Sequence, residues 1–136
     1  MTPSPRLCLS LIVLAAAALA AGCAAPPPPA PPPTGLSEVM ERPAERSLLE
    51  GIRAYDDGQY AQAEKALRKA LADGLQSARD RATAHKLLAF ITCTSDRLAD
   101  CQTQFREARA ADASFALSRS ESGHPVWGPV YKSLSQ

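Results

Sequence analysis

From Pro43 onward, apolar residues recur at the spacing expected of helices rather than strands. Leu48, Leu49, Ile52 and Tyr55 form one apolar stripe on a predicted helix. No stretch alternates apolar and polar residues with period two for long, and Ala, Leu, Arg, Gln and Glu predominate. The sequence therefore predicts an all-α domain.

Two Asp-Gly turns divide this pattern into a helical hairpin. The first helix begins at Pro43, since proline suits a first helical turn, and Asp57-Gly58 ends it. The second helix runs from Tyr60 to about Leu71 and stops at Asp73-Gly74. Its apolar side consists of Ala63, Ala66, Leu67, Ala70 and Leu71.

The spacing of small and bulky residues in this hairpin resembles a tetratricopeptide repeat. Gly51 and Ala63 stand where the two helices of the repeat approach closely, and Gly58 and Tyr60 stand at its turn. Ser47 replaces the usual tryptophan. The resemblance implies a short array of antiparallel hairpins, with a generic helical hairpin as the alternative.

A second, degenerate repeat follows, and the two together span residues 43–113. Leu88 and Ala89 begin its close contact, while Cys101, Phe105 and Ala108 replace the small and bulky residues of the first repeat. The register is longer than the usual ~34 residues. We expect the additional residues to lengthen the loop or the helix near 75–81.

Residues 114–136 are predicted to cap this array. About two repeats fall short of the three that a stacked array usually needs, so its apolar end has to be covered. Gly123-His124-Pro125 interrupts any helix, and Pro129 is placed to start a last turn or two. We expect Trp127, Val130 and Tyr131 to lie against the second repeat, with packing favoured over ligand stacking for Trp127.

The first 22 residues resemble a bacterial lipoprotein signal peptide. Arg6 precedes an uncharged stretch, Leu7–Ala21, which is shorter than the ~20 residues needed to cross a membrane. Small residues lead into Cys23, although Leu19 lies one position further from it than is usual. The alternatives are an ordinary cleaved signal and a retained membrane helix.

The lipoprotein resemblance implies that Cys23 carries a diacylglycerol and an N-acyl chain, and we expect no other cofactor. Ala24 rather than aspartate follows the cysteine, which by the same resemblance implies anchoring in the outer membrane with the domain facing the periplasm. Residues 23–42 then form a linker. Its run Pro26–Pro33 predicts a stiff polyproline II stalk on the order of 25 Å long, with a Pro-x-x-Pro docking motif as the alternative.

Composition excludes several classes of function. With 15 basic and 14 acidic residues, the sequence has no excess of positive charge that would favour binding to nucleic acid or to anionic lipid. No G-x-S-x-G, H-E-x-x-H or glycine-rich phosphate loop occurs. The sequence lacks C-x2-C, so we expect no metal site, and we assign His85 to a helix and His124 to a turn. We therefore expect no enzyme and no small-molecule substrate.

Two of the four cysteines are predicted to form a disulfide. Cys8 is removed with the signal and Cys23 carries lipid, which leaves Cys93 and Cys101 in an oxidising compartment. Their C-x7-C spacing bridges the turn between two antiparallel helices. In the register of the repeat, the two cysteines lie about one helical turn away from positions directly opposite each other. We therefore expect their Cα–Cα distance to be near the upper limit for a disulfide bond.

A broader resemblance covers roughly residues 43–131. The sequence is similar to the TssQ family of type VI secretion-associated outer-membrane lipoproteins, which are short and tetratricopeptide-like. The residues that carry the similarity are His85–Ile91, Cys93, Arg97, Cys101, Phe105-Arg106, Ala108, Phe115, Glu121 and Gly123–Tyr131. The resemblance implies an accessory role in type VI secretion.

The first helix of each such repeat lines a concave groove. That face is expected to present Leu48, Ile52, Tyr55, Lys86 and Phe90, an apolar groove with a basic rim that suits a peptide or amphipathic helix of an envelope or secretion-system protein. The alternative is that some of these side chains pack against the linker or the tail. Two other functions fit the sequence: a pilotin-like lipoprotein that assists outer-membrane assembly of a pilus or secretin subunit, and a structural lipoprotein that bridges membrane and cell wall.

Overall fold

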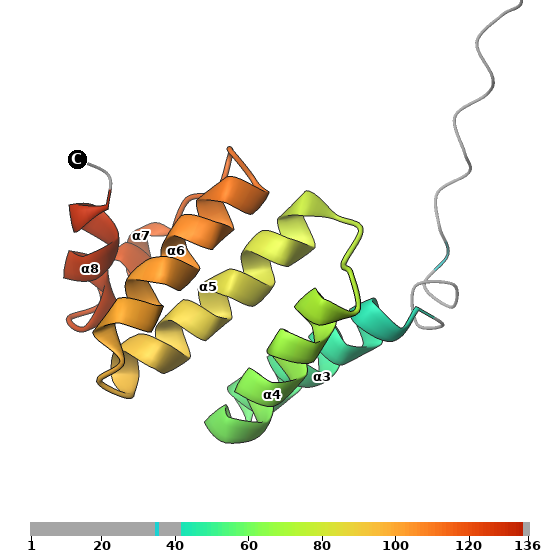
Figure 1. Cartoon of the computed structure of the whole chain (residues 1–136). Coiled ribbons are helices and arrows are strands. Elements are labelled where there is room, and N and C mark those ends of the chain that lie inside the picture. Colours follow the sequence, from blue (N-terminus) through green and yellow to red (C-terminus); the bar gives the residue numbers. More distant parts are fainter. Residues whose placement is uncertain (1–34, 36–41, 135–136) are drawn as a thin grey trace, which may run out of the picture. The chain divides into compact units, whose positions relative to one another are not determined.

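The computed structural model describes residue 35 and residues 42–134, and helices with short connections make up almost all of that part (Figure 1). No strand occurs there, which confirms the predicted all-α class. None of the described helices combines the length and the apolarity that a membrane crossing requires. The predictions for the signal peptide, Cys23 and the proline run lie outside the described residues. The helices are α3 (Pro43–Asp56), α4 (Tyr60–Ala72), α5 (Ala78–Thr94), α6 (Leu98–Ala111), α7 (Arg119–Ser122) and α8 (Trp127–Ser133).

The first hairpin, α3 and α4, has the predicted boundaries to within a residue. Pro43 is the first residue of α3. Gly58 makes the turn with φ of 73°, a left-handed conformation that glycine adopts without steric cost. The N–H of Gln59 donates to the carbonyl of Ala54 (2.8 Å), so the chain closes the end of α3 before α4 begins.

Gly51 lets α3 and α4 approach closely. A Cβ at this position would lie 2.7 Å from the Cγ of Leu67 and 3.2 Å from the backbone nitrogen of the same residue. Leu67, Ala63 and Ala70 are all completely buried on the facing side of α4. Small residues therefore set the distance between these two helices, as the repeat pattern predicts for Gly51 and Ala63.

The second hairpin, α5 and α6, is longer than the first. α5 has 17 residues against 14 in α3, so the additional residues lengthen this helix. Ser77 caps it by accepting a hydrogen bond from the N–H of Asp80. At the other end Asp96 has φ of 60°, and the N–H of Arg97 donates to the carbonyl of Thr92 (2.9 Å). This left-handed turn reverses the chain into α6.

α4 packs on α5 and joins the two hairpins within one compact unit, of which the structure describes residues 42–134. The buried hydroxyl of Thr92 donates to the carbonyls of Leu88 and Ala89, so its burial leaves no polar group unpaired. The largest fully buried side chains of the core are Phe105, Leu67, Leu88, Thr92 and Cys101.

The C-terminal strap, which we define as residues 112–134, covers the second hairpin. α8 packs against both α5 and α6. Trp127, Val130 and Tyr131 pack against the core cluster, which confirms their predicted packing. Further side chains of the strap that do so are Phe115, Leu117 and Leu134.

Two features of the strap differ from the prediction. The sequence pattern does not predict α7, a four-residue helix held by a capping box between Ser118 and Glu121. α8 begins at Trp127 rather than at Pro129. Pro129 is tolerated because the N–H groups of a first helical turn have no partner within the helix. Gly128 is buried where α7 meets α8, and a Cβ there would lie 2.6 Å from the carbonyl oxygen of Ser122.

Replacing Gly51 with alanine is expected to destabilise the domain by about 1–3 kcal/mol, because the added methyl group overlaps Leu67 and separates α3 from α4. Chemical denaturation followed by helical circular dichroism measures the free energy of unfolding. The usual effect of exchanging glycine for alanine within a helix is a stabilisation of up to about 1 kcal/mol. A measured stabilisation of that kind would contradict the close approach.

Candidate functional site

The five residues predicted to line a concave groove do not form one open surface. Leu48 and Phe90 are buried, with 5% and 4% of their surface exposed. Ile52, Tyr55 and Lys86 are half-buried. The groove is therefore divided into a part on α5 that the strap covers and a part on α3 that stays accessible.

The strap covers the α5 part at two successive points. Lys86 Nζ donates to Glu121 Oε1 of α7 at 2.7 Å. One turn further along α5, the ring of Phe90 stacks on Trp127 with 4.2 Å between ring centroids. The ring of His124 also stacks on Trp127, with 3.3 Å between ring centroids. The strap thus occupies the place where a bound peptide would contact Lys86 and Phe90, in agreement with the alternative that the tail packs there.

The ion pair between Lys86 and Glu121 is partly shielded from solvent, with 24% and 26% of the side chains exposed. Burial acts to raise the pKa of Glu121, but hydrogen bonds from Lys86 and Ser118 outweigh it and leave the pKa below its ordinary value. Trp127 Nε1 also donates to the Glu121 carbonyl at 2.8 Å. Glu121 therefore fixes α7, α5 and the start of α8 relative to one another.

The accessible part is aromatic and joins the half-buried Tyr55 of α3 to Tyr60 at the start of α4. Tyr55 packs edge-on against Tyr60, with 5.5 Å between ring centroids, and 51% of Tyr60 is exposed. Ile52 lies one turn before Tyr55 on the same helix. Burial, with the charges of nearby acidic groups including Glu121, raises the pKa of Tyr55 above its ordinary value. We refer to Ile52, Tyr55 and Tyr60 as the tyrosine patch.

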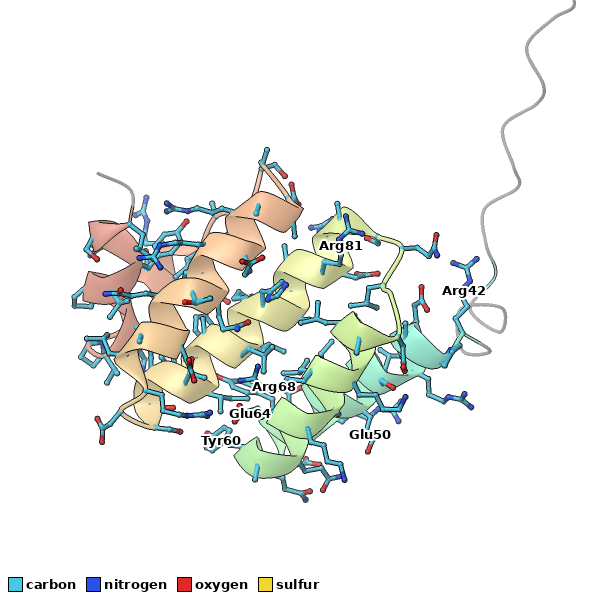
Figure 2. The ribbon with its side chains drawn as sticks, in the orientation of Figure 1. Arg42, Glu50, Tyr60, Glu64, Arg68 and Arg81 are labelled. Carbon is cyan, nitrogen blue, oxygen red and sulfur yellow. A yellow bond between two sulfur atoms is a disulfide. The ribbon has the colours of Figure 1, made fainter. Side chains whose placement is uncertain are left out.

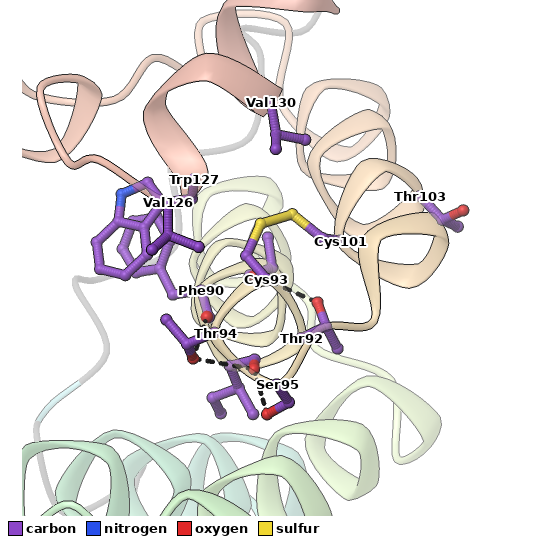
Figure 3. The surroundings of a disulfide bond; sticks show 12 residues. Phe90, Thr92, Cys93, Thr94, Ser95, Cys101, Thr103, Val126, Trp127 and Val130 are labelled. Carbon is purple, nitrogen blue, oxygen red and sulfur yellow. Dashed lines mark hydrogen bonds between the residues drawn. A yellow bond between two sulfur atoms is a disulfide. The ribbon is translucent and has the colours of Figure 1, made fainter.

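Cys93 and Cys101 form the predicted disulfide (Figure 3). Their Cα atoms are 5.0 Å apart, well within the usual bridging range, so the expectation of a near-limiting distance was wrong. Cys93 lies in the last turn of α5 and Cys101 in the first turn of α6. The left-handed conformation of Asp96, in the connection between the helices, brings the end of α5 and the start of α6 closer together than the repeat register indicates.

A charged cluster ties the two hairpins together on another side of the domain. Arg97 donates two hydrogen bonds to Glu64, one to each carboxylate oxygen, at 2.9 and 2.6 Å. Arg68 donates to the same carboxylate at 2.7 Å. In Figure 2, Glu64 and Arg68 lie on the side of α4 that faces the second hairpin. The hydrogen bond from Arg97 is the main cause that lowers the pKa of Glu64 to about 2.

A polar cleft of about 480 Å³ lies between the first half of α5 and the start of the strap. Its charged side chains come from Arg79 and Lys86 on one wall and Asp112 on the other. Hydrogen bonds from Ser114 lower the pKa of Asp112, and Lys86 is paired with Glu121. The charges around this cleft are thus nearly balanced, and no attraction for a charged ligand of either sign results.

Within residues 42–134, no three His, Cys, Asp or Glu side chains gather in a way that could hold a metal ion. His85 is half-buried in α5, where its Nδ1 lies 2.8 Å from Gln104 Oε1. His124 stacks on Trp127. Both histidines thus have packing partners in the fold.

Comparisons with known proteins do not identify a family. No protein-family model matches the chain, and no curated protein and no solved structure matches it either. The similarity to the TssQ family therefore remains a prediction from the sequence.

Removing the Glu64 carboxylate is expected to lower the free energy of unfolding at neutral pH. The variant should also lose less stability than the wild type as the pH falls. Because the pKa of Glu64 falls from about 4.5 to about 2 on folding, its ion pairs stabilise the fold above pH ~4.5, and this contribution disappears as the pH falls towards ~2. We expect Glu64→Gln to cost about 1–2 kcal/mol at pH 7, since Arg97 is partly solvent-screened.

Denaturation midpoints of wild type and Glu64→Gln between pH 2 and pH 7 measure this effect. Glu50→Gln, an exposed position on α3 (Figure 2), serves as the control and should follow the wild type. A Glu64→Gln protein that loses as much stability in acid as the wild type would contradict the assignment.

Proposed function

We propose that this chain is an adaptor of the bacterial envelope. A lipid on Cys23 anchors it in the outer membrane, a proline stalk spaces the domain from the lipid surface, and the helical domain binds another envelope protein in the periplasm. The role is that of a scaffold or accessory factor of a type VI secretion system, as the similarity to the TssQ family implies. The observation that carries the adaptor role is the tyrosine patch of the first hairpin, where Tyr60 at the start of α4 is 51% exposed beside Tyr55 of α3.

The chemistry of the patch supports a protein partner. Tyrosine side chains combine a large apolar ring with a hydroxyl group, and they are enriched where proteins bind one another. Tyr60 is 51% exposed although it lies beside the half-buried Tyr55. The ion pair between Lys86 and Glu121 adds charge at the edge that the strap forms. An amphipathic helix or peptide with an apolar face fits such a surface.

The distinctive Gly123–Tyr131 segment has a packing role that is compatible with the family resemblance. Gly128 permits the contact between α7 and α8, and Trp127 and Tyr131 cover Phe90 and Phe105. These residues build the cap and leave the α3 side of the domain for a partner. The assignment to secretion itself rests on the sequence.

Site-specific photo-crosslinking in cells tests the binding surface. A photoreactive amino acid at Tyr60 is expected to capture one envelope protein, because this side chain is exposed at the patch. Glu107, which is exposed in the second half of α6 and so lies further from the contact of Arg97 with Glu64, is the control position. Capture of the same protein from both positions, or of none from Tyr60, would argue against the patch as the binding site.

Replacing Cys23 with serine tests the anchor. We expect the variant to leave the membrane fraction as a folded domain with unchanged helical circular dichroism, and to abolish support of secretion at matched protein level, since acyl chains supply the membrane affinity. Undiminished secretion by the soluble variant would show that the anchor is dispensable for the proposed role.

A further inference from the structure

The disulfide of the second hairpin lies beneath the strap. Cys101 is completely buried and Cys93 is 6% exposed. Figure 3 shows Trp127 and Val130 of the strap in the immediate surroundings of the two sulfur atoms. Both strap residues pack against the core cluster to which Cys93 and Cys101 belong.

The strap holds the two bridged helices by one aromatic contact on each. Trp127 stacks on Phe90 of α5, one turn before the cysteine of that helix, at 4.2 Å. Tyr131 packs edge-on against Phe105 of α6, one turn after the cysteine of that helix, at 5.2 Å. Phe90 and Phe105 also pack edge-on against each other, with 6.2 Å between ring centroids, and the disulfide links α5 to α6 one turn nearer the end of the hairpin.

The sulfur atoms are poorly accessible to a second molecule, because Cys101 is completely buried and only 6% of Cys93 is exposed. Reduction of a disulfide requires a thiolate to approach one sulfur atom directly. Because the strap and the two helices bury both cysteines, that approach requires the strap to lift away from α5 and α6.

We infer that the strap and the Cys93–Cys101 disulfide form a redox latch. The closed strap protects the disulfide from dithiol reductants, and the intact disulfide holds Phe90 and Phe105 at the spacing that the strap needs. Reduction releases the strap and exposes these two aromatic side chains. The latch lies on the second hairpin, whereas the tyrosine patch lies on the first, and the Lys86–Glu121 ion pair of the strap is near both.

The chemical step is an ordinary thiol–disulfide exchange with a dithiol. One thiolate of the reductant attacks Sγ of Cys93, the S–S bond breaks, and Cys101 leaves as a thiolate that takes up a proton. The second thiol of the reductant then attacks the mixed disulfide and releases Cys93. The protein gains two electrons and two protons, and the reductant becomes a cyclic or linear disulfide.

Thermodynamic linkage couples the opening of the strap to the reduction of the disulfide in both directions. If opening the strap eases reduction, then reduction favours the open strap by the same factor. The chain offers an internal probe for this effect, since Trp127 is its single tryptophan and stands at the contact with α5.

The rate of disulfide reduction in the mature, folded protein tests protection. Samples treated with dithiothreitol are quenched in acid, labelled with maleimide and analysed by mass spectrometry. Trp127→Ala is expected to accelerate reduction at least about tenfold, because losing the stacking contact raises the open population. Val126→Ala, at the adjacent 45% exposed position, should stay within about twofold of the wild type.

A milder variant keeps the test decisive if Trp127→Ala loses its helical circular dichroism. Glu121→Gln removes the ion pair with Lys86 and leaves the aromatic contacts in place. We expect it to accelerate reduction about threefold. Unchanged reduction rates in folded variants would overturn the latch.

The reciprocal measurement uses a Cys93→Ala/Cys101→Ala double variant. We expect its Trp127 emission to shift to longer wavelength and to be quenched more strongly by acrylamide than in the oxidised wild type, while the helical signal is retained. Identical emission and quenching in the two folded proteins would show that the disulfide does not hold the strap, and would overturn the inference.

Discussion

Two helical hairpins leave one apolar face without a neighbour, and covering that face is the constraint on which the rest of the structure depends. Phe90 and Phe105 would stand at the open side of the second hairpin, and in the folded protein they are 4% and 0% exposed. A third repeat would cover such a face in a longer array. Here the C-terminal strap covers this face. Its position along α5 also determines which of the predicted groove residues remain accessible.

Close packing at small residues and a few contacts between charged groups also stabilise the domain. Gly51 and Ala63 allow α3 and α4 to approach closely, so the large side chain of Leu67 packs directly over the backbone of α3. The contact of Glu64 with Arg97 joins the first hairpin to the turn of the second. Since a domain of this size is only marginally stable, each of these contacts is a significant fraction of its free energy of unfolding.

The sequence predicted those parts of the fold that local chemistry determines. Pro43 and Gly58 mark helix ends because their backbone preferences are strong, and the structure agrees to within a residue. α7 has only four residues, too few to show a period, and the capping box of Ser118 and Glu121 is its one local signal.

The candidate site was less predictable, because its outcome depends on contacts between residues far apart in the sequence. Helical spacing places Phe90 among the predicted groove residues but does not show that Trp127 covers it. Nor does it show Tyr60 beside Tyr55, since a turn separates them in the sequence. The distance between Cys93 and Cys101 was misjudged because ideal helix register does not include the left-handed turn at Asp96.

The last described residue has a practical consequence for handling the protein. The carbonyl of Leu134 accepts a hydrogen bond from Arg109 at 2.7 Å, so the last described turn of the strap is bound to α6. A label fused at the carboxyl end would therefore stand close to a contact that holds the strap to α6. The exposed turn at Gly74, where a Cβ would meet no other atom within 4 Å, is the better place for an inserted label.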